Sequence, residues 1–370
     1  MLGMGAGGVC ARSEAADGAG GEGVEVSVLV PVLNEASSIR DTVAAMRAQD
    51  HPGPLEFIFI DGGSEDATRE ILRELAAEDE RIRVLDNPAR EVTPALNIGL
   101  RAARGRYVAR MDAHALYPRV YLSAGVRRLQ QGGAEWVSGP QIPQGTDRWS
   151  RRIELALHSP LGIGGSPFRR PLREEIETDG AFTGMWRRET LERHGGWDEA
   201  WIVNEDGELA ARLRSAGGRI VCLPQMASRY LPRRSVPALA RQYWRYGQYR
   251  AKTCRHHPRS MRRSHAVPPA IAATAGVAAL PLPLAGRVAR ASLGAYAAML
   301  VAEAVRLTGR ARPKTDAAWL PVVLATMHLA WGTGFIVGSL RFGIPWRALA
   351  RVVSGQRTLR PATAGEERLP

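Results

Sequence analysis

The chain has 370 residues, enough to bury a full core and to carry a second region beside one large domain. Its 50 Lys and Arg residues outnumber its 37 Asp and Glu residues, which gives a net charge of +13 and indicates an anionic partner such as nucleic acid, lipid head groups or a diphosphate. The three cysteines (Cys10, Cys222 and Cys254) are far apart and lack metal-ligand spacing, which argues against a disulfide scaffold and a zinc ribbon.

The N-terminal residues 1–23 are rich in Gly and Ala and have no apolar core. We therefore expect a disordered tail and not a signal peptide. Within it, GMGAGG (residues 3–8) matches the dinucleotide pattern G-x-G-x-x-G. It has no strand pattern before it and no helix pattern after it, so we interpret the match as chance.

Residues 24–112 alternate between strand and helix patterns. Continuous apolar runs predict strands at residues 24–32, 55–61, 81–87 and 107–112. Apolar residues at helical spacing follow each of the first three runs, and Thr93 followed by Pro94 predicts the N-cap of the third helix. This alternation predicts βαβ units and an α/β fold with a mostly parallel sheet.

Polar residues follow three of the predicted strands. The first strand ends at Asn34 and Glu35, the second at Asp61, and the fourth at Asp112 and His114. A single acid in such a place is usually a turn former or a helix cap. Because ligands bind at the carboxyl ends of strands in parallel sheets, we expect the three ends to build one acidic crevice.

Three motifs occur in order: PVLNE (31–35), IDGGSEDAT (60–68) and ALNIGLRAARGRYVARMDAH (95–114). Together they resemble the nucleotide-sugar domain of the GT-A glycosyltransferases of family 2. The pattern R-x-D-A-H-x-x-Y-P is most similar to the succinoglycan-type exopolysaccharide enzymes. The resemblance covers residues 24–255 and implies a Rossmann-like GT-A domain that binds a nucleoside diphosphate sugar.

The resemblance also implies roles for single residues. The residues implied to hold the nucleotide sugar are Pro31, Asn34, Glu35, Asp61, Asn97, Arg104 and Asp112. Asp112 aligns with the metal-binding D-x-D motif, in which Mn²⁺ or Mg²⁺ stabilises the departing diphosphate. His114 replaces the second Asp of that motif and is either a direct metal ligand or a phosphate contact that supports Asp112. Gly62 stands where many relatives have a second Asp, which leaves part of the nucleoside contact unassigned.

Two motifs in the second half carry the remaining chemistry. The segment TDGAFTGMWRRETLERHGGWDE (178–199) resembles the family's acceptor-side segment, which implies that Asp179 and Gly184 border the sugar pocket. In NEDGELAARLRSAGG (204–218), Glu205 and Asp206 fall in the first turn of a helix, where acidic residues are favourable in any protein. The match with the family's E-D motif implies that Asp206 is the general base of an inverting transfer and that Glu205 orients the acceptor or the loop.

Aromatic residues accompany these motifs. QYWRYG (242–247) resembles the Q-x-x-R-W motif with Tyr246 in place of Trp, which implies that Gln242 and Arg245 bind the pyrophosphate or the acceptor's lipid phosphate. The side chains of Trp186, Trp197 and Trp201 either stack on sugar rings or belong to the core.

Two long uncharged segments, residues 267–286 and 317–340, lie near the C-terminus. Each is long enough to cross a bilayer, and residues 291–302 are a shorter third candidate. Buried helices of a soluble protein are the alternative. We expect a membrane region at residues 256–345 and a tail at 346–370, with the catalytic domain on the cytoplasmic side of the inner membrane and the preceding Arg-rich residues near an anionic leaflet.

The prediction is therefore an inverting hexosyltransferase of exopolysaccharide or cell-envelope polysaccharide synthesis. Its first donor candidate is UDP-glucose, its acceptor a polyprenyl-diphosphate-linked glycan at the membrane, and it has no nucleic-acid partner. The alternatives are a basic nucleic-acid-binding protein, a sugar nucleotidyltransferase on a similar sheet and an inactive scaffold. The first leaves the acidic strand ends unexplained, and the second lacks the expected Gly-rich, Lys-bearing start.

Overall fold

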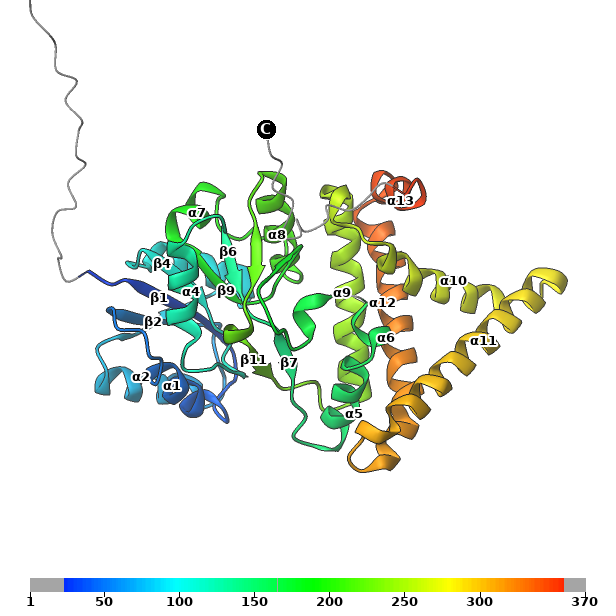
Figure 1. The fold of residues 1–370 in the computed structure, drawn as a ribbon, viewed down its shortest axis with the longest axis horizontal. Helices are drawn as coiled ribbons and strands as arrows, with labels where there is room; N and C mark the ends of the chain where they lie inside the picture. The colour runs from blue at the N-terminus through cyan, green and yellow to red at the C-terminus, as the bar shows by residue number, and fades with distance from the viewer. Residues whose placement is uncertain (1–22, 165, 356–370) are drawn as a thin grey trace, which may run out of the picture.

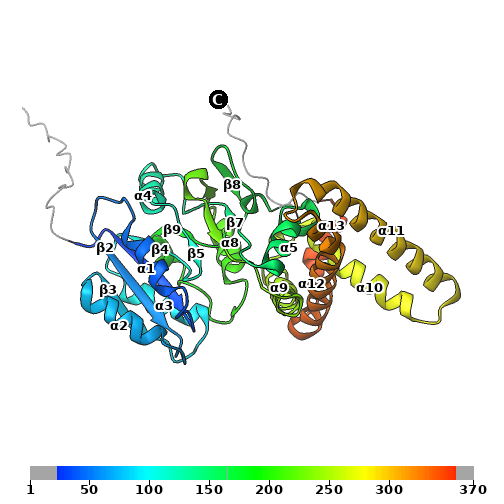
Figure 2. The same cartoon turned by 90° about the horizontal axis from the view of Figure 1, so that it is seen from below.

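The computed structural model describes residues 23–355 apart from Gly165. The predicted disorder of residues 1–23 falls almost wholly outside the described residues. A region built around a sheet occupies one side of the molecule, and a group of long helices occupies the other (Figures 1 and 2).

The main sheet confirms the predicted α/β fold. In the described part of the chain it has eight strands in the order β3-β2-β1-β4-β9-β6-β10-β8, and the four that come first in the sequence run parallel. All seven residues of β2 are buried, as expected for a strand covered on both faces. The strands are β1 (Val26–Val32), β2 (Leu55–Asp61), β3 (Ile82–Asp86), β4 (Tyr107–Arg110), β6 (Trp136–Ser138), β8 (Ile176–Thr178), β9 (Gly184–Arg187) and β10 (Ile220–Cys222).

Helices cover both faces of this sheet. One face packs against α1 (Ile39–Arg47), α2 (Thr68–Glu78) and α4 (Tyr121–Gln130). The other packs against α3 (Val92–Ala102), α7 (Arg188–Arg193) and α8 (Glu205–Ser215). A small second sheet joins β5 (Ala115–Leu116), β11 (Ser228–Tyr230) and β7 (Gln141–Pro143).

Two details of the predicted elements differ in the structure. Helix α3 begins at Val92 and has Glu91 at its N-cap, so the prediction that Thr93 caps it was wrong. Thr93 lies inside the first turn with its side chain fully buried, and its hydroxyl has no hydrogen-bond partner among the described residues. Trp186 and Trp197 are buried in one core cluster and Trp201 is also buried, so these rings belong to the interior.

The helical region begins with α9 (Val236–His256), which crosses the boundary predicted at residue 255. After it come α10 (Val267–Ala279), α11 (Pro283–Leu307), α12 (Leu320–Phe342) and α13 (Trp346–Val353), and two short helices, α5 (Arg148–Leu157) and α6 (Pro160–Ile163), pack beside them. Helices α9 and α12 lie side by side in both views, and α10 and α11 project outward (Figures 1 and 2). Helix α13 lies at the start of the predicted C-terminal tail.

Two helices of residues 23–355 are long and apolar enough to cross a membrane, at Pro283–Arg310 and Lys314–Phe342. The second contains the predicted span at 317–340, and the first contains the shorter candidate at 291–302. The predicted span at 267–286 is not one helix, because α10 ends at Ala279 and a new helix starts at Pro283. Exposed apolar side chains on α11 and α12 are Leu284, Val288, Met299, Val301, Val305, Val322, Ile336, Val337 and Leu340.

Glycines bring α9 and α12 into backbone contact. A Cβ atom added at Gly247 of α9 would lie 2.0 Å from the Trp331 carbonyl oxygen of α12. One added at Gly334 of α12 would lie 2.1 Å from the Trp244 carbonyl oxygen of α9. Small residues allow helices to approach this closely, so the contact depends on the absence of side chains.

We expect Gly334→Ala to lower the midpoint of thermal unfolding, because the added methyl group forces α9 and α12 apart at a cost of about 1–3 kcal/mol. Gly294→Ala on α11 is the matched control, since no described atom lies within 4 Å of its added Cβ. Ala has the higher helix propensity, so the control should melt at the same or a higher temperature. Equal melting of the two variants in detergent would contradict the close packing of the helices.

Candidate active site

A cavity of about 710 Å³ lies between the sheet region and the helical region. Strand β4, helix α8 and helix α9 supply its polar wall, and α10, α11 and α12 supply residues on the other side. Six of the residues singled out in the sequence line this cavity: Asp112, His114, Asp179, Glu205, Asp206 and Gln242. Carboxylates more than ninety positions apart along the chain therefore share one hollow.

Arg110 connects the two acidic motifs. Its Nε donates to Asp112 Oδ1 at 3.1 Å, and its Nη1 donates to Glu205 Oε1 at 2.9 Å. Burial by itself raises the pKa of Asp112, but the charges of Arg110 and His114 outweigh it and hold that pKa below the ordinary value. Asp112 is therefore an anion at neutral pH, as a metal ligand has to be.

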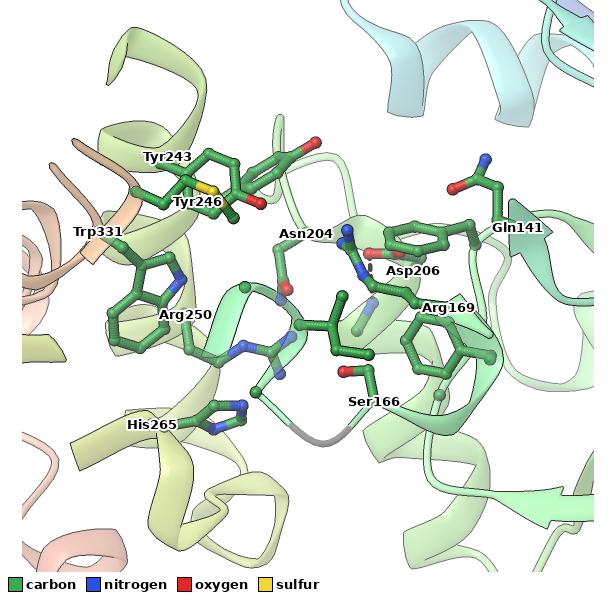
Figure 3. A pocket seen from close by; sticks show the side chains of 18 of the residues that line it. Gln141, Ser166, Arg169, Asn204, Asp206, Tyr243, Tyr246, Arg250, His265 and Trp331 are labelled. Atoms are coloured by element: carbon green, nitrogen blue, oxygen red, sulfur yellow. Dashed lines mark hydrogen bonds between the residues drawn. The ribbon is translucent and has the colours of Figure 1, made fainter. Parts of the chain in front are cut away.

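Asp206 lies in the first turn of α8, where its Oδ1 accepts a hydrogen bond of 2.7 Å from the Gly207 amide. Burial raises the pKa of Asp206 to about 7, and the neighbouring negative charge of Glu205 contributes in the same direction. A carboxylate with a pKa close to neutrality is well suited to accept a proton during catalysis. Figure 3 shows Asp206 facing into the cavity, on the same side as Arg169.

The position of Asp206 depends on helix α9. Asn204, immediately before α8, has a left-handed backbone with φ of 63°, and its side-chain amide donates to Thr253 Oγ1 of α9 at 2.8 Å. Trp201 Nε1 donates to the same oxygen at 2.9 Å, and the Thr253 hydroxyl donates to the Tyr249 carbonyl oxygen at 3.0 Å. One fully satisfied, buried hydroxyl thus ties the loop before α8 to α9.

His114 and Glu35 bring the end of β1 next to Asp112. His114 Nδ1 lies 3.1 Å from Glu35 Oε1, and this hydrogen bond raises the pKa of His114. In the described part of the chain, no group of three or more His, Cys, Asp or Glu side chains is arranged to hold a metal ion. A divalent cation held by one or two carboxylates together with substrate phosphates needs no such group. Asp112, with His114 beside it, fits that donor set.

Two further arginines that line the cavity were not identified from the sequence. Arg250 extends from α9 and Arg169 from the opposite wall (Figure 3). Arg169 lies with its Cζ 4.7 Å from the centre of the Phe182 ring. Burial lowers the pKa of Arg250 from its ordinary value, although the guanidinium stays charged at neutral pH.

Comparisons with known proteins identify the family to which the chain belongs. A model of the family described as glycosyl transferase family 2 matches residues 27–195. The succinoglycan biosynthesis protein ExoA of Rhizobium meliloti (strain 1021) is 34% identical over 311 residues, which cover 83% of this chain and 93% of that protein. The chain belongs to glycosyltransferase family 2. This confirms the resemblance that the sequence motifs predict.

Two further proteins are similar to this chain at lower identity. A dolichyl N-acetyl-alpha-D-glucosaminyl phosphate 3-beta-D-2,3-diacetamido-2,3-dideoxy-beta-D-glucuronosyltransferase of Methanococcus voltae is 26% identical over 230 residues, 60% of this chain and 71% of that protein. The mannosyltransferase PcManGT of Pyrobaculum calidifontis, solved with GDP-Man and Mn²⁺, superposes with a TM-score of 0.52 at 21% identity, covering 90% of this chain and 88% of that one. That likeness shows the GT-A fold.

Four of the residues that family 2 motifs assign to the nucleotide lie beside the cavity at the strand ends. Pro31, Asn34, Glu35 and Asp61 are not among the described residues that line it. Asn34 has a left-handed backbone with φ of 57°, and Asp61 is buried and accepts 2.6 and 3.2 Å hydrogen bonds from the Ser64 hydroxyl and amide. Glu35 contacts His114, which lines the cavity, so this group adjoins Asp112.

Three other assignments do not fit the structure. Arg104 precedes β4 and its amide donates to Glu56 at the amino edge of the sheet, the edge opposite Asp112, so its assignment to the diphosphate was wrong. The Asn97 side chain is occupied by the backbone of Trp197, which it fixes with 2.8 and 2.9 Å hydrogen bonds. Gly184 is buried and does not line the cavity, and an added Cβ would lie 2.3 Å from Trp136 Nε1, so its lack of a side chain allows close packing.

On α9, Arg250 lines the cavity, whereas the family 2 motif indicates Arg245. Gln242, Tyr246 and Arg250 line the cavity at four-residue spacing, and Gln242 Nε2 donates to the Tyr246 hydroxyl at 2.9 Å. Arg245 is exposed on another face of the helix and does not line the cavity. Helical periodicity is the signal that separates Arg245 from Arg250.

Asp179 lines the cavity, but its charge is already paired. Arg262, which follows α9, donates from Nε to Asp179 Oδ2 at 2.6 Å and also contacts Oδ1. Arg262 Nη1 donates to Ser166 Oγ at 3.1 Å. The predicted acceptor-side aspartate therefore holds the segment between α9 and α10 against the sheet region.

Proposed function

We propose that this family 2 glycosyltransferase is an inverting hexosyltransferase that uses a nucleoside diphosphate sugar, with UDP-glucose as the first donor candidate. The observation that carries the proposal is the pairing, in one cavity, of an ionised Asp112 and an Asp206 whose pKa is about 7. The first is suited to hold a cation on a diphosphate, and the second to take a proton.

In the proposed reaction, the acceptor hydroxyl oxygen attacks the anomeric carbon of the donor sugar. The bond from that carbon to the diphosphate oxygen breaks, the nucleoside diphosphate leaves with the electron pair, and the hydroxyl proton passes to Asp206. Asp112 and His114 would hold Mn²⁺ or Mg²⁺, which supplies positive charge to the departing diphosphate. Arg110 pairs with both Asp112 and Glu205 and so holds the two carboxylates in place.

We further propose a lipid-linked glycan, such as a polyprenyl-diphosphate glycan, as the acceptor, in exopolysaccharide or cell-envelope polysaccharide synthesis. The names of similar proteins support this choice, because one is a succinoglycan biosynthesis protein and another acts on a dolichyl phosphate sugar. Two candidate membrane helices and exposed apolar residues on α11 and α12 support a membrane location. The catalytic domain would lie on the cytoplasmic side of the inner membrane, where Cys222 and Cys254, both unpaired, stay reduced.

A screen of donors tests the proposal. Membranes containing the full chain are given UDP-, GDP- and dTDP-sugars with Mn²⁺, and released nucleoside diphosphate is measured with and without EDTA. We expect one nucleotide class, UDP first, to be consumed and EDTA to abolish the release. No release from any donor would favour the inactive scaffold, and release that EDTA does not affect would overturn the metal assignment.

A further inference from the structure

In the middle of the cavity, not every positively charged side chain is paired with a negatively charged one. Asp112 and Glu205 are paired with Arg110, and Asp179 is paired with Arg262. Within residues 23–355, the side chains of Arg250 and Arg169 have neither a hydrogen bond nor an ion pair, yet both line the cavity. Two unpaired guanidinium groups that face one space form a site for a strongly charged anion.

The cavity continues past these arginines to an apolar end. Its lining there comes from α6 and the long helices, and includes Ile163, Val267, Ile271, Met327 and Trp331. Such a wall cannot stabilise a sugar or a nucleotide by hydrogen bonds, but it matches a hydrocarbon chain. A ligand that fills both the arginine-lined part and the apolar end of the cavity has a charged head group beside Asp206 and an apolar chain.

A second hollow of about 310 Å³ extends this path outward between α10 and α11. It shares the lining residues Val267, Ile271 and Tyr296 with the main cavity, so the two hollows adjoin each other. Helix α11, which contributes Ser292, Leu293 and Tyr296 to this hollow, also exposes apolar side chains, with Leu284 73% and Val288 58% accessible. Helices α10 and α11, which line this hollow, project from the rest of the molecule (Figures 1 and 2).

From this arrangement we infer a binding site for a phosphate-headed lipid chain. Arg250 and Arg169 bind its phosphate or diphosphate, and the chain leaves between α10 and α11 past Val267 and Ile271. The head group carries the accepting hydroxyl toward Asp206, while the donor diphosphate stays at the Asp112 side. This inference rests on the proposed transferase function and specifies how its acceptor is held.

Equilibrium binding of three probes to the purified full chain in detergent tests the site. Farnesyl diphosphate has both parts of the ligand, farnesol has only the chain, and inorganic diphosphate has only the charge. EDTA is present so that no cation recruits diphosphate to Asp112. We expect farnesyl diphosphate to bind at least about tenfold more tightly than either of the other two.

Two variants separate the contributions of the head and the chain. Arg250→Gln should weaken farnesyl diphosphate binding about ten- to a hundredfold and leave farnesol binding unchanged, because a charged hydrogen-bond donor is lost. Ile271→Trp should weaken farnesyl diphosphate binding by filling the outer path, and leave inorganic diphosphate binding unchanged. Arg241→Gln, an exposed position on α9 outside the cavity, is the matched control and should behave as the wild type.

Equal affinity for farnesyl diphosphate and inorganic diphosphate would overturn the chain path, and equal affinity for farnesol would overturn the phosphate site. A result in which Arg250→Gln binds like Arg241→Gln would also overturn it. UDP binding with Mn²⁺, measured without EDTA on aliquots of the same protein preparations, reports the donor side. If UDP binds and farnesyl diphosphate does not, the lipid site is wrong and the transferase proposal stands; if neither binds, both fail.

Discussion

Asp206→Asn should reduce nucleoside diphosphate release by about 10²–10⁴-fold, because it removes the group that accepts the acceptor's proton. The amide oxygen of Asn can still accept the hydrogen bond from Gly207, so the geometry of the loop should persist. The measurement is single-turnover transfer in membranes with the donor found by the screen. Glu189→Gln, an exposed acid in the first turn of α7, is the matched control and should keep full activity.

The pH dependence of the same reaction gives an independent test of Asp206 as the proton acceptor. Since the pKa of Asp206 is about 7, wild-type transfer should fall tenfold for each pH unit below about 7, as the base becomes protonated. A rate that stays constant from pH 8 down to pH 5 would contradict the role of Asp206. Equal release by the wild type and Asp206→Asn would contradict it as well.

Asp206 should also make the fold less stable at high pH. Its folded pKa of about 7 lies above the ordinary 3.8, so the folded state binds the proton more tightly than the unfolded state does. The resulting stabilisation is fully present below about pH 4 and is lost as the pH rises through about 7. Asp206→Asn should therefore have a higher melting temperature than the wild type at pH 8, and this difference should disappear at low pH. Because a variant that melts in this way is folded, its loss of transfer is a loss of catalysis and not of structure.

Arg110→Met should destabilise the protein by about 3–5 kcal/mol, because it leaves Asp112 and Glu205 buried without their cation. It should also move the lower pH limit of transfer upward, since Arg110 lowers the pKa of Asp206. The measurements are denaturant unfolding in detergent and the pH profile of transfer. Arg106→Met, an exposed position just before the same strand, is the control.

A double variant makes the Arg110 prediction specific. Adding Glu205→Gln to Arg110→Met removes one of the two unpaired charges and should restore part of the lost stability. If the double variant is as unstable as the sum of the two single changes, the carboxylates do not act through Arg110. The control for this comparison is Glu205→Gln alone.

The strands could be predicted because their apolar runs are continuous and end abruptly at polar residues. Parallel pairing then brings the ends of β1, β2 and β4 to one edge, which is why Asp112 and His114 could be placed beside Glu35 before the structure was known. Asp206 was predictable from its motif. Its elevated pKa was not, because that depends on burial by residues far away in the sequence.

Arg262 and Arg250 were not identified from the sequence for a different reason. Arg262 pairs with Asp179 across 83 positions of the chain, and this contact exists only because α9 folds back against the sheet region. Helical spacing places Arg250 on the face of Gln242, but the sequence does not say which face meets the cavity. Hydropathy joined α10 to the start of α11, because a run without charge does not show that prolines divide it.

The packing of α9 against α12 also matters for the preparation of the catalytic region by itself. A shortened chain ending at residue 255 would keep every strand of the described residues, yet the face of α9 around Gly247 would be bare where α12 now covers it. Through Thr253, loss of that support would reach the loop that carries Asp206. A soluble fragment should therefore keep nucleotide affinity but lose turnover, and lipid nanodiscs with the uncut chain are the appropriate starting material.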